Sequence, residues 1–213
     1  MPRICAQLLE GCATSHAKAA PARATSREIS PLPGAEYRFL ALDVETANGD
    51  CASICQIGLA CVRHDGLIDS WSSYIDPEVP FSPFNTRLHG IGPVEVCGAP
   101  RFLDVIAVLE PLLNRHVIFQ HSGFDQRAIA GAFALAGVRA PSWLWQDSVK
   151  IARCAWPEFR GDGGHGLAHL KDRLGLDFAH HDAAEDARAA AMVVLLAEQR
   201  MGRNFEEIFE IQV

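Results

Sequence analysis

The sequence predicts an α/β domain built on a mixed β-sheet, and three observations predict it. Short apolar runs of strand length come first along the chain. From Phe102 onward, segments with helical spacing alternate with further short runs. Strands that are followed by alternating strands and helices are typical of a layered α/β fold. The length of 213 residues fits one domain with tails.

The first three predicted strands form a meander. The run Phe39-Leu-Ala-Leu-Asp-Val44 is short and nearly all apolar, which is typical of a central strand covered on both faces. Residues 54–62 and 67–75 are the next two expected strands, and Arg63-His-Asp-Gly66 supplies the turn between them. The Pro- and Gly-rich residues 76–100 are expected to form a loop.

The remaining elements alternate. We expect helices at 102–113, 124–137, 148–155, 167–174 and 182–202, with strands at 117–120 and 143–146. This order is that of a ribonuclease-H-like fold, a mixed five-stranded sheet flanked by helices.

The two ends of the chain have a different composition from the predicted domain. We expect residues 1–36, rich in Ala, Ser, Pro and Arg, to be a flexible leader. The domain then covers residues 37–202 and a C-terminal tail covers 203–213. Phe205, Ile208 and Phe209 in that tail could dock on a partner or on the protein's own core, and we favour the core.

Composition excludes several classes of protein. The net charge of −7 argues against a broad basic surface that grips nucleic acid by neutralising phosphates. No apolar stretch reaches the roughly 18 residues of a membrane helix, and no secretion signal is visible. Seven scattered cysteines argue against a disulfide framework and predict a reducing, cytoplasmic location.

Two carboxylates at the end of the first strand are the strongest single feature. Asp43 and Glu45 are two residues apart, so both side chains project from one face of a strand that should be apolar. Adjacent like charges are costly unless a cation compensates them, and hard oxygen ligands suit Mg²⁺ or Mn²⁺. The alternative is an exposed strand end with solvated acids, and the motif alone does not decide between the two.

A third carboxylate, Asp125, lies just after the strand at 117–120. Ser122 and Asp125 match the S-x-x-D pattern of a capping box, which explains the aspartate without any metal. Considered alone, this motif favours the cap.

The start of the last helix combines a histidine with two more acids. Asp182 and Glu185 form a capping box, so Asp182 is expected as the N-cap. His181 and Asp186 then occupy the two positions that a hydrophobic staple brings together, and both side chains can face one site. A single histidine is usually surface or core, and its apposition with Asp186 is what favours a functional role.

The order of these groups along the chain resembles the DEDDh exonuclease superfamily, which includes the proofreading epsilon subunit of bacterial DNA polymerase III. The residues that carry the resemblance are Asp43, Glu45, Asp125, His181 and Asp186. Supporting matches are the stretch Asp43-Val-Glu-Thr-Ala-Asn48, the His89-Gly-Ile91 loop and Asp147-Ser148. One departure is Gln120-His121, where relatives often have His-Asn. The residues of these motifs most resemble those of stand-alone epsilon-like exonucleases.

The resemblance implies 3′→5′ removal of nucleotides from single-stranded DNA by hydrolysis, with release of nucleoside monophosphates. It implies that Asp43, Glu45, Asp125 and Asp186 hold two Mg²⁺ or Mn²⁺ ions and that His181 is the general base. Thr46, His89 and Phe124 are expected to contact the terminal nucleotide.

Other functions stay open. The same chemistry could act on short RNA or tRNA 3′ ends, because recognition of the 2′-hydroxyl depends on pocket contacts that the sequence does not place. An exonuclease-like accessory subunit that mainly binds a DNA polymerase is a further alternative, against which the presence of all five catalytic-type residues counts. A soluble α/β domain whose acids only cap helices is the third.

Overall fold

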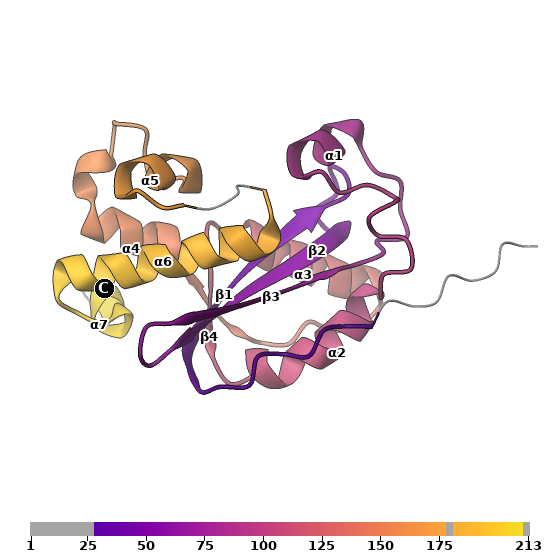
Figure 1. Cartoon of the computed structure of the whole chain (residues 1–213), viewed down its shortest axis with the longest axis horizontal. Helices are drawn as coiled ribbons and strands as arrows, with labels where there is room; N and C mark the ends of the chain where they lie inside the picture. Colours follow the sequence, from indigo (N-terminus) through magenta and orange to yellow (C-terminus); the bar gives the residue numbers. More distant parts are fainter. Residues whose placement is uncertain (1–27, 178–180, 211–213) are drawn as a thin grey trace, which may run out of the picture.

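A mixed sheet runs through the centre of the molecule in the computed structural model, which describes residues 28–177 and 181–210 (Figure 1). The five strands lie in the order β3-β2-β1-β4-β5. The first three, β1 (Tyr37–Thr46), β2 (Ile54–Arg63) and β3 (Ile68–Tyr74), form an antiparallel meander. The other two, β4 (Val117–Gln120) and β5 (Leu144–Asp147), run parallel to β1. The predicted ribonuclease-H-like sheet is confirmed.

Helices cover both faces of this sheet. They are α1 (Pro83–His89), α2 (Phe102–Leu113), α3 (Phe124–Leu135), α4 (Ser148–Ala155), α5 (Leu167–Leu174), α6 (Ala183–Met201) and α7 (Phe205–Glu210), with a 3₁₀ turn η1 (Pro157–Phe159). Three of these elements, α1, η1 and α7, were not predicted from the sequence. A signal for α1 was present, because Ser82 caps it, Pro83 follows as the first helical residue, and Gly90 ends it in the left-handed conformation at φ 77°.

The alternation of side chains along β1 divides the core into two layers. Leu40 and Leu42 point to the face that α2 and α3 cover. Phe39 and Ala41 point to the opposite face, which α6 covers together with α4, α5 and α7. Because side chains repeat every two residues in a strand, Asp43 and Glu45 continue the α6 face to the carboxyl end of β1.

One glycine lets α6 approach the sheet closely. Gly58 on β2 pairs with Asp43 of β1. A Cβ at Gly58 would lie 2.0 Å from the backbone carbon of Ala183, the first residue of α6. Only a residue without a side chain therefore allows the start of α6 to rest on the sheet beside Asp43.

The segments next to the domain contact its core. Phe205 and Ile208 of α7 are buried and Phe209 packs against the same cluster, so the expected docking on the protein's own core is confirmed. Residues 28–36 form no helix or strand, but Ile29 and Leu32 pack on the core beneath β3 and the Trp71 indole donates a hydrogen bond to the Ser30 carbonyl. The rest of the predicted leader lies outside the described residues.

Two further expectations concern the environment of the chain. The five cysteines that the structure describes are all free thiols. Among the described helices, none combines the length and the apolar character that crossing a membrane requires. The cytoplasmic location stays a prediction.

Candidate active site

The carboxyl end of β1 presents two acids toward the start of α6. Glu45 is only 8% exposed and Asp43 is half-buried. Both follow the buried run Phe39–Leu42, so the surrounding strand holds them at the edge of the core instead of in free solvent. The reading of an exposed strand end with solvated acids is therefore wrong for this pair.

The start of α3 delivers the third acid to the same place. Asp125 is 3% exposed, and its Oδ1 accepts a hydrogen bond of 3.1 Å from the backbone N–H of Val44, which lies between Asp43 and Glu45. The carboxylate therefore reaches across to β1.

The capping box predicted for Ser122 and Asp125 is wrong. The N-cap of α3 is Gly123, and no side chain caps it. The Gln120 side chain takes over part of this role, because its Oε1 accepts from the backbone N–H of Gln126 at 2.9 Å. The Gln126 N–H is therefore satisfied from β4, and the Asp125 carboxylate reaches the Val44 N–H of β1.

The predicted N-cap of α6 is confirmed, whereas no hydrogen bond from the Glu185 side chain that would complete the predicted capping box is among the described contacts of α6. Asp182 is the N-cap, and its Oδ1 accepts from the backbone N–H groups of Ala184 and Glu185 at 3.0 and 3.2 Å. The backbone N–H of His181 donates to Asp186 Oδ2 at 2.9 Å, which brings these two residues together across the helix start. His181 adopts φ 69°, a left-handed conformation that costs free energy in a residue other than glycine.

Three side chains from two elements converge on one point. One ligand atom from each of Glu45, His181 and Asp186 lies within 4.8 Å of the other two. Asp186 is 4% exposed, so this point lies at the floor of the site. The staple-like apposition of His181 and Asp186 predicted from the sequence is thus present, and Glu45 of β1 joins it.

Mutual repulsion of the acids shows in their pKa values. Burial, and then the charges of Asp186 and Asp125, raise the pKa of Glu45 to about 8. Burial raises the pKa of Asp125 to about 7, although the Val44 N–H opposes the shift. Burial and the Asp125 charge also raise the pKa of Asp43 well above its usual range. Carboxylates that come from β1, α3 and α6 therefore share one electrostatic site.

These residues fit a divalent metal centre. Carboxylate oxygens are the ligands that Mg²⁺ and Mn²⁺ prefer, and an imidazole beside them is compatible with Mn²⁺. A cation would also offset the burial and the repulsion that raise the pKa values of Glu45 and Asp125. The site therefore offers the ligand atoms that a divalent cation binds, and a bound cation would stabilise the ionised carboxylates.

The two substrate residues expected on the α1 side lie beside each other at the end of β1. His89 Nε2 donates to the Thr46 carbonyl at 3.1 Å, while the backbone N–H of Ile91 donates to His89 Nδ1 at 3.0 Å. This pattern requires the neutral ring, and burial lowers the pKa of His89 accordingly. Asn85 adds a second bond from α1 to the Thr46 carbonyl at 2.9 Å.

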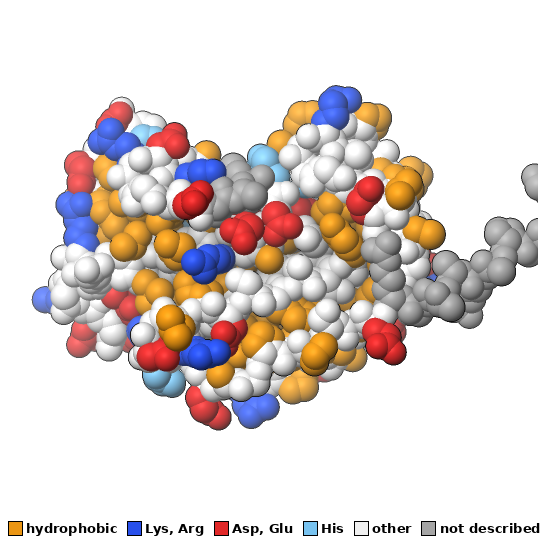
Figure 2. Space-filling view, viewed as in Figure 1, with side chains coloured by type: hydrophobic (Ala, Val, Ile, Leu, Met, Phe, Trp, Pro, Cys, Tyr) orange, Lys and Arg blue, Asp and Glu red, His pale blue; other side chains and the backbone are white. Residues whose placement is uncertain are grey.

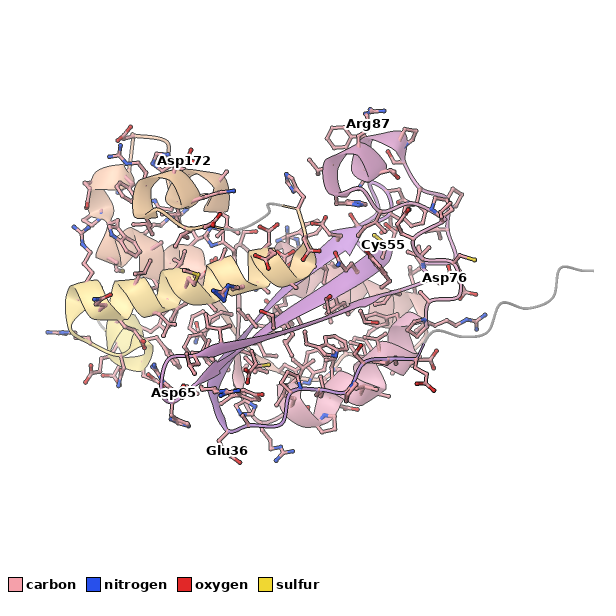
Figure 3. All side chains as sticks on the ribbon, viewed as in Figure 1. Glu36, Cys55, Asp65, Asp76, Arg87 and Asp172 are labelled. Atoms are coloured by element: carbon pink, nitrogen blue, oxygen red, sulfur yellow. The ribbon has the colours of Figure 1, made fainter. Side chains whose placement is uncertain are left out.

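A hollow lies above the acids. Figure 2 shows acidic side chains at its base, between one lobe formed by α1 and another formed by α5. Figure 3 places Arg87 on the first lobe and Asp172 on the second, on opposite sides of this hollow. Phe124 at the start of α3 is 37% exposed, so it is not part of the core.

Two supporting residues escaped the sequence analysis. Gln56 on β2 is 4% exposed, and its amide bonds both to Asp182 Oδ2 at 3.3 Å and to the backbone N–H of Ala183 at 3.2 Å. A polar side chain inside the apolar strand 54–62 was a usable signal. His121 links two loops beside the site, since Nε2 donates to the His165 carbonyl at 2.9 Å and Nδ1 lies 2.8 Å from Ser148 Oγ.

A protein-family match covers the residues that form this site. A family model described as an exonuclease, of the RNase T type, matches residues 40–194. The chain belongs to this exonuclease family. Its five motif residues all fall inside the matched segment.

Curated relatives of this exonuclease domain are PolC-type DNA polymerase III chains. The chain from Streptococcus agalactiae is 26% identical over 182 residues, which cover 83% of this chain and 12% of that protein. The chain from Bacillus cereus is 27% identical over 177 residues, which cover 81% and 12%. This exonuclease-family chain thus spans about an eighth of the length of the polymerases it matches.

Solved exonucleases share the fold. Exonuclease X in complex with 5′-overhanging duplex DNA superposes with a TM-score of 0.63 at 21% identity, covering 79% of this chain and 95% of that one. Escherichia coli exonuclease I in complex with a dA13 oligonucleotide gives 0.67 at 19%, covering 82% and 43%. The nuclease domain of 3′hExo, a DEDDh family member bound to rAMP, gives 0.63 at 18%, covering 76% and 91%.

Proposed function

We propose that this exonuclease-family chain is a metal-dependent 3′→5′ exonuclease that hydrolyses phosphodiester bonds at the 3′ end of single-stranded DNA and releases nucleoside monophosphates. One observation carries the proposal. Buried carboxylates from three separate elements raise one another's pKa values in a single site, and an imidazole lies beside them. A domain whose acids only cap helices would have no reason to place Asp125 against the backbone of β1.

The four carboxylates Asp43, Glu45, Asp125 and Asp186 are the proposed ligands. Two divalent ions held there would supply activation of a water molecule and stabilisation of the negative charge on the scissile phosphate and the leaving 3′-oxygen. The ligand residues hold formal charges that two such ions balance, so an acidic protein can accept a phosphodiester at this point. Mg²⁺ and Mn²⁺ both suit this donor set.

His181 is the proposed general base. Imidazole has an unperturbed pKa of about 6.5, so a neutral ring is available at physiological pH. It takes the proton of the attacking water as the new bond between oxygen and phosphorus forms and the bond from phosphorus to the 3′-oxygen breaks. The bond from the His181 backbone to Asp186 keeps the ring beside the ligands during this transfer.

Thr46, His89 and Phe124 are the proposed contacts to the terminal nucleotide. Thr46 and His89 lie on the α1 side of the hollow, and the exposed ring of Phe124 offers a face on which a base can stack. Aromatic stacking tolerates any base, and a strand end that enters a confined hollow must be unpaired. Both points favour single-stranded ends without sequence preference.

The test is digestion of 5′-labelled single-stranded DNA and RNA of the same sequence, with Mg²⁺, Mn²⁺ or EDTA. We expect a ladder that shortens from the 3′ end, abolished by EDTA and by Asp43→Asn. Asp65→Asn is the matched control, because Asp65 is an exposed acid of the β2–β3 turn, at the opposite end of the sheet (Figure 3). Immediate release of labelled mononucleotide, or activity that survives EDTA, would contradict the proposal.

The comparison of DNA with RNA in the same assay decides between the two substrate classes. Faster digestion of RNA would favour short RNA 3′ ends. The DNA polymerase III relatives motivate one partner, a polymerase subunit. Co-elution with a replicative polymerase in gel filtration would support that partner, and separate elution at micromolar concentrations would contradict it.

A further inference from the structure

A second polar pocket lies outside the acidic site, between the end of α4 and the loop that precedes α5. Its volume is about 590 Å³. The residues that line it are Arg153, Pro157, Arg160, Gly161, Gly164 and His165. No acidic residue is among them, although the protein as a whole carries a net charge of −7.

The charge of this pocket is uncompensated. The two acids of the neighbouring segment are engaged elsewhere, since Glu158 pairs with Arg200 at 2.9 Å and Asp162 pairs with Arg173 at 3.2 Å. Within residues 28–177 and 181–210, no ion pair involves Arg153 or Arg160. Two exposed guanidinium groups therefore face a concave surface without a carboxylate to neutralise them.

The inner wall of the pocket is fixed, and it adjoins the acidic site. The ring of His165 is buried and donates from Nε2 to the Trp156 carbonyl at 2.8 Å. The carbonyl of His165 accepts from His121 Nε2 at 2.9 Å. His121 follows the last residue of β4, so it joins the wall of the pocket to the carboxyl end of the sheet, where the proposed metal ligands also lie.

We propose that this pocket binds a phosphate group of the nucleic-acid strand, upstream of the bond that is cleaved. The proposal rests on the proposed exonuclease function and names how the strand is held. Guanidinium groups match phosphate oxygens in two-point hydrogen bonds. A protein without a broad basic surface needs such a local site to hold a polyanion, because the metal centre engages only the terminal phosphodiester.

A distant phosphate site makes activity depend on strand length. A substrate that is too short to reach Arg153 and Arg160 gains nothing from them. Longer strands gain affinity without a change in the chemical step. The pocket should therefore affect KM for long strands and leave kcat unchanged.

The experiment compares wild type with Arg153→Gln/Arg160→Gln on three substrates: a chromogenic ester of thymidine 5′-monophosphate, a dinucleotide and a single-stranded 12-mer. We expect KM for the 12-mer to rise about tenfold in the variant, with kcat and both short substrates unchanged. The slope of log KM against the logarithm of the salt concentration should decrease by about 0.7 for each lost phosphate contact. Arg153→Lys/Arg160→Lys should restore part of the affinity.

Arg139→Gln is the matched control. Arg139 is exposed and lies between α3 and β5, where β5 begins, at the opposite end of that strand from the site. Equal effects of Arg139→Gln and Arg153→Gln/Arg160→Gln would overturn the pocket and indicate only general electrostatic attraction. An unchanged KM for the 12-mer in Arg153→Gln/Arg160→Gln would overturn it as well.

Binding without catalysis separates this proposal from the proposed function. Fluorescence anisotropy of a labelled 12-mer with Asp43→Asn protein, with and without the arginine substitutions, tests the pocket even if no substrate is hydrolysed. A titration with inorganic phosphate tests the other source of the same chemistry. Thermal stabilisation by phosphate at micromolar concentration, lost in Arg153→Gln/Arg160→Gln, would identify a site for free phosphate and overturn the strand contact.

Discussion

The starts of α3 and α6 both deliver an aspartate to the site, but different forces hold them. The start of α6 is held locally, because Asp182 caps the helix through two backbone N–H groups and the His181 backbone bonds to Asp186. The start of α3 has no side-chain cap at its own N-cap residue. It depends on neighbouring strands, through Gln120 at the end of β4 and through Val44 of β1.

The two helix starts have different proposed roles. A carboxylate that bonds to the strand between Asp43 and Glu45 cannot move independently of them, so the position of Asp125, a proposed ligand, is fixed relative to both. His181 lies outside the regular helix in a left-handed conformation, next to residues 178–180, which the structure does not describe. We infer that Asp125 at the α3 start would act as a ligand alone, whereas the α6 start would supply both a ligand, Asp186, and the base, His181.

The largest expected effect comes from removing these groups. His181→Ala and Asp186→Ala should each lower kcat by about 10² to 10⁴. Thermal stabilisation by Mn²⁺ should survive in His181→Ala and be lost in Asp125→Asn, because only the second change removes a proposed ligand. Turnover and differential scanning fluorimetry measure the two quantities. Near-normal turnover of His181→Ala would remove the distinction between the two helix starts.

A pair of glycines tests how each helix meets the sheet. Gly58→Ala would place a Cβ 2.0 Å from the Ala183 backbone at the α6 start, so we expect a loss of about 1–3 kcal/mol and a fall in activity. Gly131→Ala on α3 is the matched change, since its Cβ would lie 3.1 Å from the Cβ of Ala52. The gain in helix propensity there offsets that contact by up to about 1 kcal/mol. Urea unfolding of both variants measures the difference, and equal losses would contradict it.

The acids also predict how stability depends on pH. Because the pKa of Asp125 is raised to about 7 and that of Glu45 to about 8, the folded protein binds these protons more tightly than the unfolded chain does. The resulting stability is present below pH about 4 and is lost as pH rises through 7 and 8. Chelator-treated protein should therefore melt at a lower temperature at pH 9 than at pH 6, and Mn²⁺ should offset the fall.

Variants assign this pH dependence to its source. Asp125→Asn should reduce the change of melting temperature with pH near pH 7, and Glu45→Gln should reduce it near pH 8. A melting temperature of the chelated wild type that stays constant from pH 6 to 9 would show that the pKa values of Asp125 and Glu45 are not raised in the folded protein.

The smallest expected effects concern the caps themselves. Asp182→Ala removes a real cap and should cost about 1 kcal/mol, with a matching loss of order at the α6 start. Ser122→Ala removes no cap, so its effect should stay within about 0.5 kcal/mol. Chemical denaturation compares the two variants. A larger loss of unfolding free energy in Ser122→Ala than in Asp182→Ala would support a capping box at the start of α3.

Sequence patterns correctly predicted the features that depend on residues close together in the chain. The apolar run 39–44 predicted a central strand, and the acids of residues 182–185 predicted the α6 cap, since both depend on neighbours in sequence. The capping box at Ser122 failed because a long-range bond to Val44 and the Gln120 side chain compete for the same groups. The role of Gly58 was beyond reach because it depends on where α6 crosses β2. Gln56, a polar residue in an apolar strand, was a usable signal, but its partners also depend on that crossing.

The attachment of α1 has a consequence for how the molecule opens. This helix buries none of its own residues, and the hydrogen bonds of Asn85 and His89 to the Thr46 carbonyl tie it to β1. Elements that bury little apolar surface separate from a protein at a small fraction of the global unfolding free energy. Amide hydrogens of residues 84–89 should accordingly exchange with deuterium well before those of α6, and limited proteolysis should begin on this side of the hollow.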